Sequence, residues 1–382
     1  MRNLGNTLTR LAAIRGGAMS PGNGAETTRL RALTSFGSNP GALGAQVYTP
    51  PRLSRGAPLV VVLHGCTQTA AAFDAGSGWS RLADRDGFAL LYPEQQRSNN
   101  PALCFNWFAP EDARRGSGEA ASIMQMIETF TNANTLDRRR VFITGLSAGG
   151  AMASVMLAAY PELFAGGAII AGLPFGVART VPEAFDRMRG NGGGSALQLA
   201  TSVQNASGHH GDWPTISIWH GTADQTVASS NGEDLAVQWR GVHALGAPPS
   251  VQQSHGPYVY RAWRNKAGRD CVLHYAVKGM GHGVPIDAAS GIGAVGPYMI
   301  DAGVSSTDMI ARSWGISDHA AQVETAQSET ATGKAAKPVI KPSAPRSFHF
   351  PTLLNAGNAS PESTPNGVRQ VIENALRKAG LM

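Results

Sequence analysis

The sequence predicts an α/β fold in which a mostly parallel central sheet carries helices on both faces. Short apolar runs alternate along the chain with stretches of helical periodicity, as expected when strands and helices alternate. The clearest run, Leu59–Leu63, is apolar throughout, which is typical of a strand covered on both faces. Hydrophobic residues make up 42% of the 382 residues and charged residues only 15%, enough for one large core.

The elements follow in a regular order. Residues 1–40 are rich in glycine and threonine and are expected to be a flexible lead-in, and residues 41–317 are expected to form the main domain. Strands are predicted at the apolar runs Leu59–Leu63, Phe88–Tyr92, Val141–Thr144, Gly167–Ala171, Ile216–Trp219 and Cys271–Val277. Helices are predicted at Glu119–Phe130, Met152–Ala159 and Asn231–Trp239.

Three segments depart from this alternation. Residues 172–214 contain Gly192-Gly193-Gly194 and are interpreted as an insertion, either a partial lid over the active-site end or a surface excursion without a role. Residues 318–365 are rich in Ala, Ser, Thr, Lys and Pro and are expected to be a disordered linker. Residues 366–382 carry apolar residues at helical spacing and predict a C-terminal helix.

Charge, hydrophobicity and cysteine content argue against a nucleic-acid-binding, a membrane-spanning or a zinc-binding protein. The net charge is +6, but the basic residues are scattered, and Arg138-Arg139-Arg140 is interpreted as a solvated entry to a strand, so no nucleic-acid partner is expected. No apolar run is long enough to span a bilayer, and no export signal is legible. Three cysteines without a Cys-x-x-Cys pair exclude a zinc site, and allow either one disulfide and a free thiol or three buried thiols.

The strongest chemical signal is the pentapeptide Gly145-Leu-Ser147-Ala-Gly149. It follows a predicted strand and opens a predicted helix, the context in which a Gly-x-Ser-x-Gly serine stands on a sharp turn as a nucleophile. The glycines are needed because strand and helix must close together at this turn. Ser147 is therefore the predicted nucleophile of an α/β-hydrolase fold.

A serine hydroxyl needs a base to take its proton and an acid to orient that base, and in this fold the chain order is Ser, acid, His. Asp224 lies in the loop after the predicted strand Ile216–Trp219, where the acid belongs. A loop aspartate that caps the following helix is the alternative. Among ten histidines, His282 follows both Asp224 and the predicted strand Cys271–Val277 and is flanked by glycines, so it is the predicted base.

The oxyanion hole needs two N–H donors. The N–H of Ala148 is expected to be one, and the N–H of Cys66, in the loop after the first central strand, the other. The side chains of Thr67 and Gln68 are expected to brace that loop, and Gln68 is also a candidate for substrate binding. Trp107 and Phe108 are candidates to line an acyl or polymer groove, with core packing as the alternative.

Five ordered motifs over residues 40–316 resemble the polyhydroxybutyrate depolymerase family of esterases, which is related to feruloyl and acetylxylan esterases. The motifs are Leu63–Gln68, Cys104–Phe108, Gly145–Gly150, His220–Val227 and Gly279–Gly283. The resemblance implies ester hydrolysis through an acyl-enzyme, and it supports the three triad positions. Members are often secreted, and some pair the two motif cysteines, here Cys66 and Cys104. An extracellular location is expected on this basis, with a cytoplasmic one as the alternative.

The predicted function is a serine carboxylic-ester hydrolase acting on oligomeric or polymeric hydroxybutyrate or on short-chain esters. An acetylxylan or feruloyl esterase is the nearest alternative, because pocket shape rather than fold sets acyl specificity. Acyl transfer to an alcohol and a non-catalytic scaffold are the others. Neither metal nor organic cofactor is expected, and the expected partner is an ester or polyester substrate.

Overall fold

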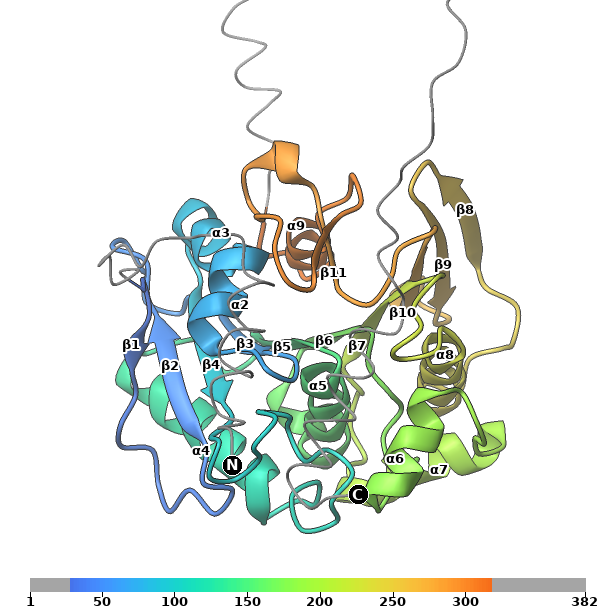
Figure 1. Cartoon of the computed structure of the whole chain (residues 1–382), viewed down its shortest axis with the longest axis horizontal. Helices are drawn as coiled ribbons and strands as arrows, with labels where there is room; N and C mark the ends of the chain where they lie inside the picture. Colours follow the sequence, from blue (N-terminus) through green and yellow to red (C-terminus); the bar gives the residue numbers. More distant parts are fainter. Residues whose placement is uncertain (1–27, 318–382) are drawn as a thin grey trace, which may run out of the picture.

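The computed structural model describes residues 28–317, and within them a ten-stranded sheet crosses the molecule in the order β1-β2-β4-β3-β5-β6-β7-β10-β9-β8 (Figure 1). Its strands are β1 (Arg31–Ala32), β2 (Gly44–Tyr48), β3 (Leu59–Leu63), β4 (Ala89–Glu94), β5 (Val141–Leu146), β6 (Gly166–Ile170), β7 (Thr215–Gly221), β8 (Val251–His255), β9 (Tyr258–Arg264) and β10 (Asp270–Val277). The helices are α2 (Ala70–Ser77), α3 (Trp79–Asp86), α4 (Gly118–Ala133), α5 (Ala148–Ala159), α6 (Val181–Met188), α7 (Ala196–Ser207), α8 (Ser230–Val242) and α9 (Ser306–Ser313). A small parallel pair is formed by β11 (Val284–Ile286) and β12 (Met299–Asp301).

The central strands β4, β3, β5, β6, β7 and β10 are parallel to one another, and the strands at both edges are antiparallel. The predicted fold class, a mostly parallel α/β sheet with helices on both faces, is confirmed. Because the carboxyl ends of parallel strands meet at one edge of the sheet, the loops after β3, β5, β7 and β10 gather there.

The two faces of the sheet are covered by different helices. In β3 all five residues are buried: Leu59, Val61 and Leu63 belong to one core cluster, and Val60 and Val62 to the other. The first cluster includes α4, α5 and α8, and the second includes α2, α3 and α9. Figure 1 shows α2, α3 and α9 above the sheet and α4 and α5 below it. Burying each such side chain contributes about 1.5–3 kcal/mol, so β3 is a major source of stability.

One helix begins earlier than predicted. The expected helix Met152–Ala159 starts at Ala148, so that its first turn contains two glycines. The hairpin β8–β9 was not predicted, and its first strand ends at His255. This strand is an edge with exposed polar side chains, which leaves little apolar signal.

The expectation of a flexible lead-in over residues 1–40 is wrong for residues 28–40. Strand β1 pairs with β2, and the side chains of Leu30 and Phe36 are buried in the two cores. The Asn39 N–H also donates to Gln125 Oε1 of α4 at 2.9 Å. Leu33 also packs against the core, so apolar contacts and strand pairing together dock this segment. Residues 1–27, the segment 318–365 predicted as a linker and the segment 366–382 predicted as a helix lie outside the described residues.

Candidate active site

The turn after β5 holds Ser147 in a strained conformation, with φ 58° and ψ −118°. Its N–H donates to the Ile170 carbonyl at 2.9 Å, which fixes the turn to β6. A Cβ on Gly145 would stand 2.4 Å from the Gly149 carbonyl oxygen, and a Cβ on Gly149 would stand 2.4 Å from that of His64. Both contacts are with backbone atoms, so only glycine fits. The backbone thus presents Ser147 at the start of α5, where free N–H groups and the positive end of the helix dipole lie.

Asp224 lies in the loop after β7 with both carboxylate oxygens engaged. Its Oδ1 accepts the N–H groups of Thr226 and Val227, each at 2.9 Å, and its Oδ2 accepts from His282 Nδ1 at 2.7 Å. Burial by itself raises the pKa of Asp224, but the hydrogen bonds and charges of His220 and His282 outweigh burial and leave the pKa well below its usual value. The carboxylate is therefore ionised and positioned to orient an imidazole.

His282 lies in the glycine-flanked loop after β10, and its side chain is almost fully buried. Because its Nδ1–H donates to Asp224, the neutral ring carries a lone pair on Nε2, the form that can accept a proton. Ser147 and His282 line the same small cavity, together with Gly65, Cys66, Gln68, Leu146 and Tyr298. The structure thus brings together the three side chains predicted as nucleophile, acid and base.

The loop after β3 carries the other predicted donor. No hydrogen bond among the described residues uses the N–H of Cys66, and the Ala148 N–H opens helix α5, where it has no partner within the helix. Gln68 braces this loop, as predicted, because its Oε1 accepts the Gly65 N–H at 2.9 Å. The side chain of Thr67 is exposed, and this residue holds the loop through its own N–H, which donates to the Ala102 carbonyl at 2.7 Å.

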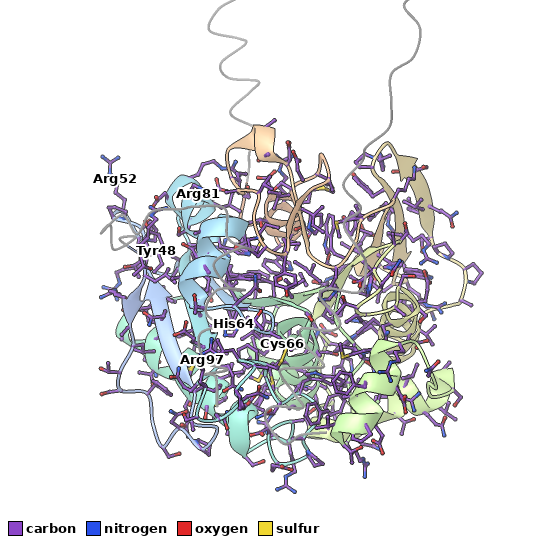
Figure 2. All side chains as sticks on the ribbon, in the orientation of Figure 1. Tyr48, Arg52, His64, Cys66, Arg81 and Arg97 are labelled. Atoms are coloured by element: carbon purple, nitrogen blue, oxygen red, sulfur yellow. A yellow bond between two sulfur atoms is a disulfide. The ribbon has the colours of Figure 1, made fainter. Side chains whose placement is uncertain are left out.

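A disulfide joins Cys66 to Cys104, and Cys271 is a buried free thiol. His64 and Cys66 lie close together near the middle of the molecule (Figure 2). Cys104 belongs to the loop that carries Trp107 and Phe108, so the disulfide connects a predicted oxyanion donor to the predicted substrate-binding aromatics. His64 also supports this region, since its Nε2 accepts the Gln95 N–H at 3.2 Å.

Trp107 and Phe108 separate two hollows. The inner one, a cavity of about 40 Å³, is also lined by Ser147, Ala148 and the disulfide, and is mostly apolar. The outer one, a groove of about 540 Å³, is lined on its far side by residues of 175–206, including Phe175 and Arg179. The two aromatic side chains thus lie at the site rather than only in the core.

Sequence reasoning missed the contribution of helix α6. Its residues Val181, Ala184, Phe185 and Met188 line the inner cavity opposite Ser147. Their spacing of i, i+3, i+4 and i+7 places them on one helix face, and this pattern was the available signal. Tyr298, whose ring centroid lies 6.3 Å from that of His282, was also missed, because nothing in the local sequence connects it with the base.

A buried glutamate holds the aromatic loop from behind. Glu119 Oε2 accepts the Asn106 N–H at 2.9 Å, and Oε1 accepts from the side chains of Gln95 and Asn99. Burial raises the pKa of Glu119 to about 8, with a further contribution from the charge of Asp112, against the opposing effect of these hydrogen bonds.

None of the helices formed by residues 28–317 has the length and apolar character needed for a membrane span. Over the same residues, no group of three or more His, Cys, Asp or Glu side chains is arranged to hold a metal ion.

The chain is similar to known esterases in sequence and in fold. A family model described as "Esterase PHB depolymerase" matches residues 43–247. The chain is 41% identical to poly(3-hydroxyalkanoate) depolymerase C of Paucimonas lemoignei over 75% of this chain and 70% of that protein. It is 30% identical to acetylxylan esterase A of Emericella nidulans, over 68% of this chain and 86% of that protein. The solved structure of acetyl xylan esterase from Aspergillus awamori aligns with a TM-score of 0.66 at 25% identity, covering 75% of this chain and 99% of that one.

Proposed function

The chain belongs to the PHB depolymerase family of esterases, and on that premise we propose that it hydrolyses carboxylic esters through a Ser147–His282–Asp224 triad. The observation that carries the proposal is the 2.7 Å contact between His282 Nδ1 and Asp224 Oδ2, made beside a strained serine that lines the same cavity as the imidazole.

In the proposed reaction, Ser147 Oγ attacks the ester carbonyl carbon while His282 Nε2 takes the hydroxyl proton. The carbonyl oxygen becomes an oxyanion that accepts from the N–H groups of Cys66 and Ala148. When the intermediate collapses, His282 returns the proton to the leaving alkoxide, and an alcohol and an acyl-enzyme result. Water then repeats the sequence, with His282 as base, and releases the acid. Asp224 holds the imidazolium throughout.

The two hollows favour a short acyl group carried on a longer chain. The inner cavity has room for only a small apolar group beside Ser147, and the outer groove can hold further repeating units against Trp107 and Phe108. An oligomer of hydroxybutyrate has this form, and the depolymerase relative is named for such polymers. The same narrow inner cavity also suits an acetyl group, which makes an acetylxylan esterase the second candidate.

We also propose that residues 172–214 act as a partial lid, since α6 closes the inner cavity opposite the nucleophile. The Cys66–Cys104 disulfide supports an extracellular location, because disulfides persist in oxidising surroundings. Fractionation of the producing cells, with the protein found outside the cytoplasm, is the expected result.

The experiment compares the wild type with Ser147→Ala and with the matched control Ser154→Ala. Ser154 lies on the same helix, buried, and its hydroxyl has no hydrogen-bond partner among the described residues. The substrates are p-nitrophenyl acetate and butyrate, 3-hydroxybutyrate oligomers and acetylated xylan. We expect Ser147→Ala to lose several orders of magnitude in kcat and Ser154→Ala to lose little.

The natural substrates separate the two candidate functions. A clear preference for 3-hydroxybutyrate oligomers indicates a depolymerase, and a preference for acetylated xylan indicates an acetylxylan esterase. An added acceptor alcohol that diverts the product to a new ester would indicate acyl transfer instead. A wild type inactive on every ester would indicate a scaffold, and a Ser147→Ala enzyme with near-normal activity would refute the triad.

A further inference from the structure

Two buried histidines lie behind the catalytic carboxylate, each with one ring nitrogen that has no hydrogen-bond partner. His220 lies in β7 and His274 in the neighbouring strand β10, and each is only 2% exposed. The unpartnered atoms are His220 Nδ1 and His274 Nε2. A buried polar atom without a partner is costly, so a matching pair of them calls for an explanation.

The partners of the other two ring nitrogens determine which tautomer each histidine adopts. His220 Nε2 lies 2.9 Å from the Val227 carbonyl oxygen, which can only accept, so Nε2 carries the hydrogen and Nδ1 is an acceptor. His274 Nδ1 contacts Arg261 Nη2, which can only donate, so Nδ1 is the acceptor and Nε2 carries the hydrogen. Burial lowers the pKa of His274 to about 4, which is consistent with a neutral ring. The two unpartnered atoms are thus one donor and one acceptor.

Both unpartnered atoms lie against the backbone of Gly232 on α8. A Cβ on this residue would stand 3.1 Å from His274 Nε2 and 3.2 Å from His220 Nδ1. The two atoms therefore lie close to each other on the side of Gly232 that has no side chain, and any side chain on residue 232 would crowd both imidazole rings. A molecule that accepts from one atom and donates to the other would satisfy both, and water is the smallest that can.

We propose that one internal water molecule binds beside Gly232, accepts from His274 and donates to His220, and that His220 thereby serves as a positioning residue for the catalytic carboxylate. The inference rests on the proposed triad. The His220 Nε2 atom, whose hydrogen is directed at the Val227 carbonyl, also lies 3.4 Å from Asp224 Oδ2, the same oxygen that accepts from His282. His220 thus adds a longer polar contact to this oxygen, while Oδ1 accepts two backbone N–H groups.

The network extends from the site to the protein surface. Arg261 of β9 also contacts Glu233 Oε1 of α8 at 2.5 Å, and Glu233 is half exposed. The groups in the network are therefore Glu233, Arg261, His274, His220 and Asp224, ending at His282. The proposed effect of the network is to hold His220 in place, so that its Nε2 restrains the Asp224 carboxylate that orients His282.

The kinetic test compares His220→Phe with His220→Gln. Phenylalanine removes the Nε2 donor at similar volume, whereas the glutamine amide nitrogen can reach the same place. We expect His220→Phe to lower kcat by about 3-fold to 10-fold, the effect of one ordinary hydrogen bond, with little change in KM. The acid limb of the kcat/KM pH profile should move to higher pH, because a carboxylate with one donor fewer attracts the imidazolium more strongly. His220→Gln should restore most of kcat and return the acid limb of the pH profile to its wild-type position.

The water site has its own test in Gly232→Ala. In a helix, alanine for glycine normally stabilises the protein. Here we expect a lower Tm, because the methyl group displaces the water and leaves two buried atoms unpaired, and an acid limb that moves in the same direction as in His220→Phe. If His220→Phe does not fold, the Tm and pH profile of Gly232→Ala alone test the proposal. A raised Tm with an unchanged pH profile would overturn the proposal, as would a folded His220→Phe enzyme with wild-type kcat and pH profile.

Ser147→Ala, measured in parallel, separates this inference from the proposed function. If Ser147→Ala keeps its activity, the triad itself is wrong. If it is inactive while the His220 and Gly232 variants behave as wild type, only the support behind Asp224 is wrong.

Discussion

Replacing Asp224 with asparagine tests the site through a change of one atom. The carboxylate Oδ1 accepts two backbone N–H groups at 2.9 Å, so the asparagine carbonyl oxygen is expected to occupy that position. The opposite orientation would place the amide hydrogens against those N–H groups and would lose two hydrogen bonds, each worth about 0.5–1.5 kcal/mol. The amide nitrogen therefore faces His282.

In this orientation the asparagine amide group, a donor, faces His282 Nδ1, whereas in the wild type the Asp224 carboxylate accepts from that nitrogen. The imidazole must then carry its hydrogen on Nε2, the atom that has to accept the proton of Ser147. The fraction of enzyme with a working base falls, and the positive charge that forms on the ring loses its counter-ion. For a triad acid changed to its amide, the expected loss in kcat is about 10⁴-fold, or about 5.5 kcal/mol of transition-state stabilisation.

The assay is kcat/KM for p-nitrophenyl butyrate near neutral pH, with circular dichroism and thermal unfolding to show that the variant is folded. Asp212→Asn is the matched control, because Asp212 is exposed and lies outside the site. We expect the control to retain wild-type activity. A folded Asp224→Asn enzyme with more than about a tenth of wild-type kcat/KM would show that Asp224 does not orient the base.

Three further changes test the surroundings of the site. Cys104→Ser should lower stability by about 2–4 kcal/mol in urea unfolding and should also lower kcat/KM, because it frees the donor loop, whereas Cys271→Ser should change neither strongly. Phe185→Ala enlarges the inner cavity and should raise the ratio of octanoate to acetate ester hydrolysis, an effect that Leu197→Ala on the exposed face of α7 should not reproduce. The raised pKa of Glu119, about 8 against 4.5 in the unfolded chain, means that the folded protein holds the extra proton. Stability should therefore fall as pH rises between these values, and a flat pH series of unfolding measurements, or one that Glu119→Gln leaves unchanged, would contradict this reasoning.

The central part of the fold could be predicted because its signals are local. The bounds of β3 are those expected from the apolar run Leu59–Leu63, and the strand–turn–helix context of Ser147 follows from the pentapeptide and its flanks. Cys66, Asp224 and His282 were selected because each follows an expected strand, where functional groups stand in a parallel sheet. The chain order Ser, acid, His then gave Asp224 and His282 their roles.

The features that could not be predicted depend on contacts between distant segments. Helix α5 begins at Ala148 rather than Met152. Its first turn contains Gly149, a poor helix former, which is present because a side chain there would collide with the backbone at the end of β3. The exposed hairpin β8–β9 has little apolar periodicity. Tyr298 reaches the site only after β11 and β12 pair, and Phe185 only because α6 packs across the cavity opening.

The order of strands in the sheet has a consequence for how the protein is made. A chain growing from its N-terminus can complete β3, β5 and the turn at Ser147 when little more than its first 170 residues are available. Strand β10 must still be synthesised and added beside β7 before His282 can reach that turn. The residues of the nucleophile turn are therefore synthesised more than a hundred residues before the base. Catalytic competence cannot precede the synthesis of β10 and of the loop that carries His282.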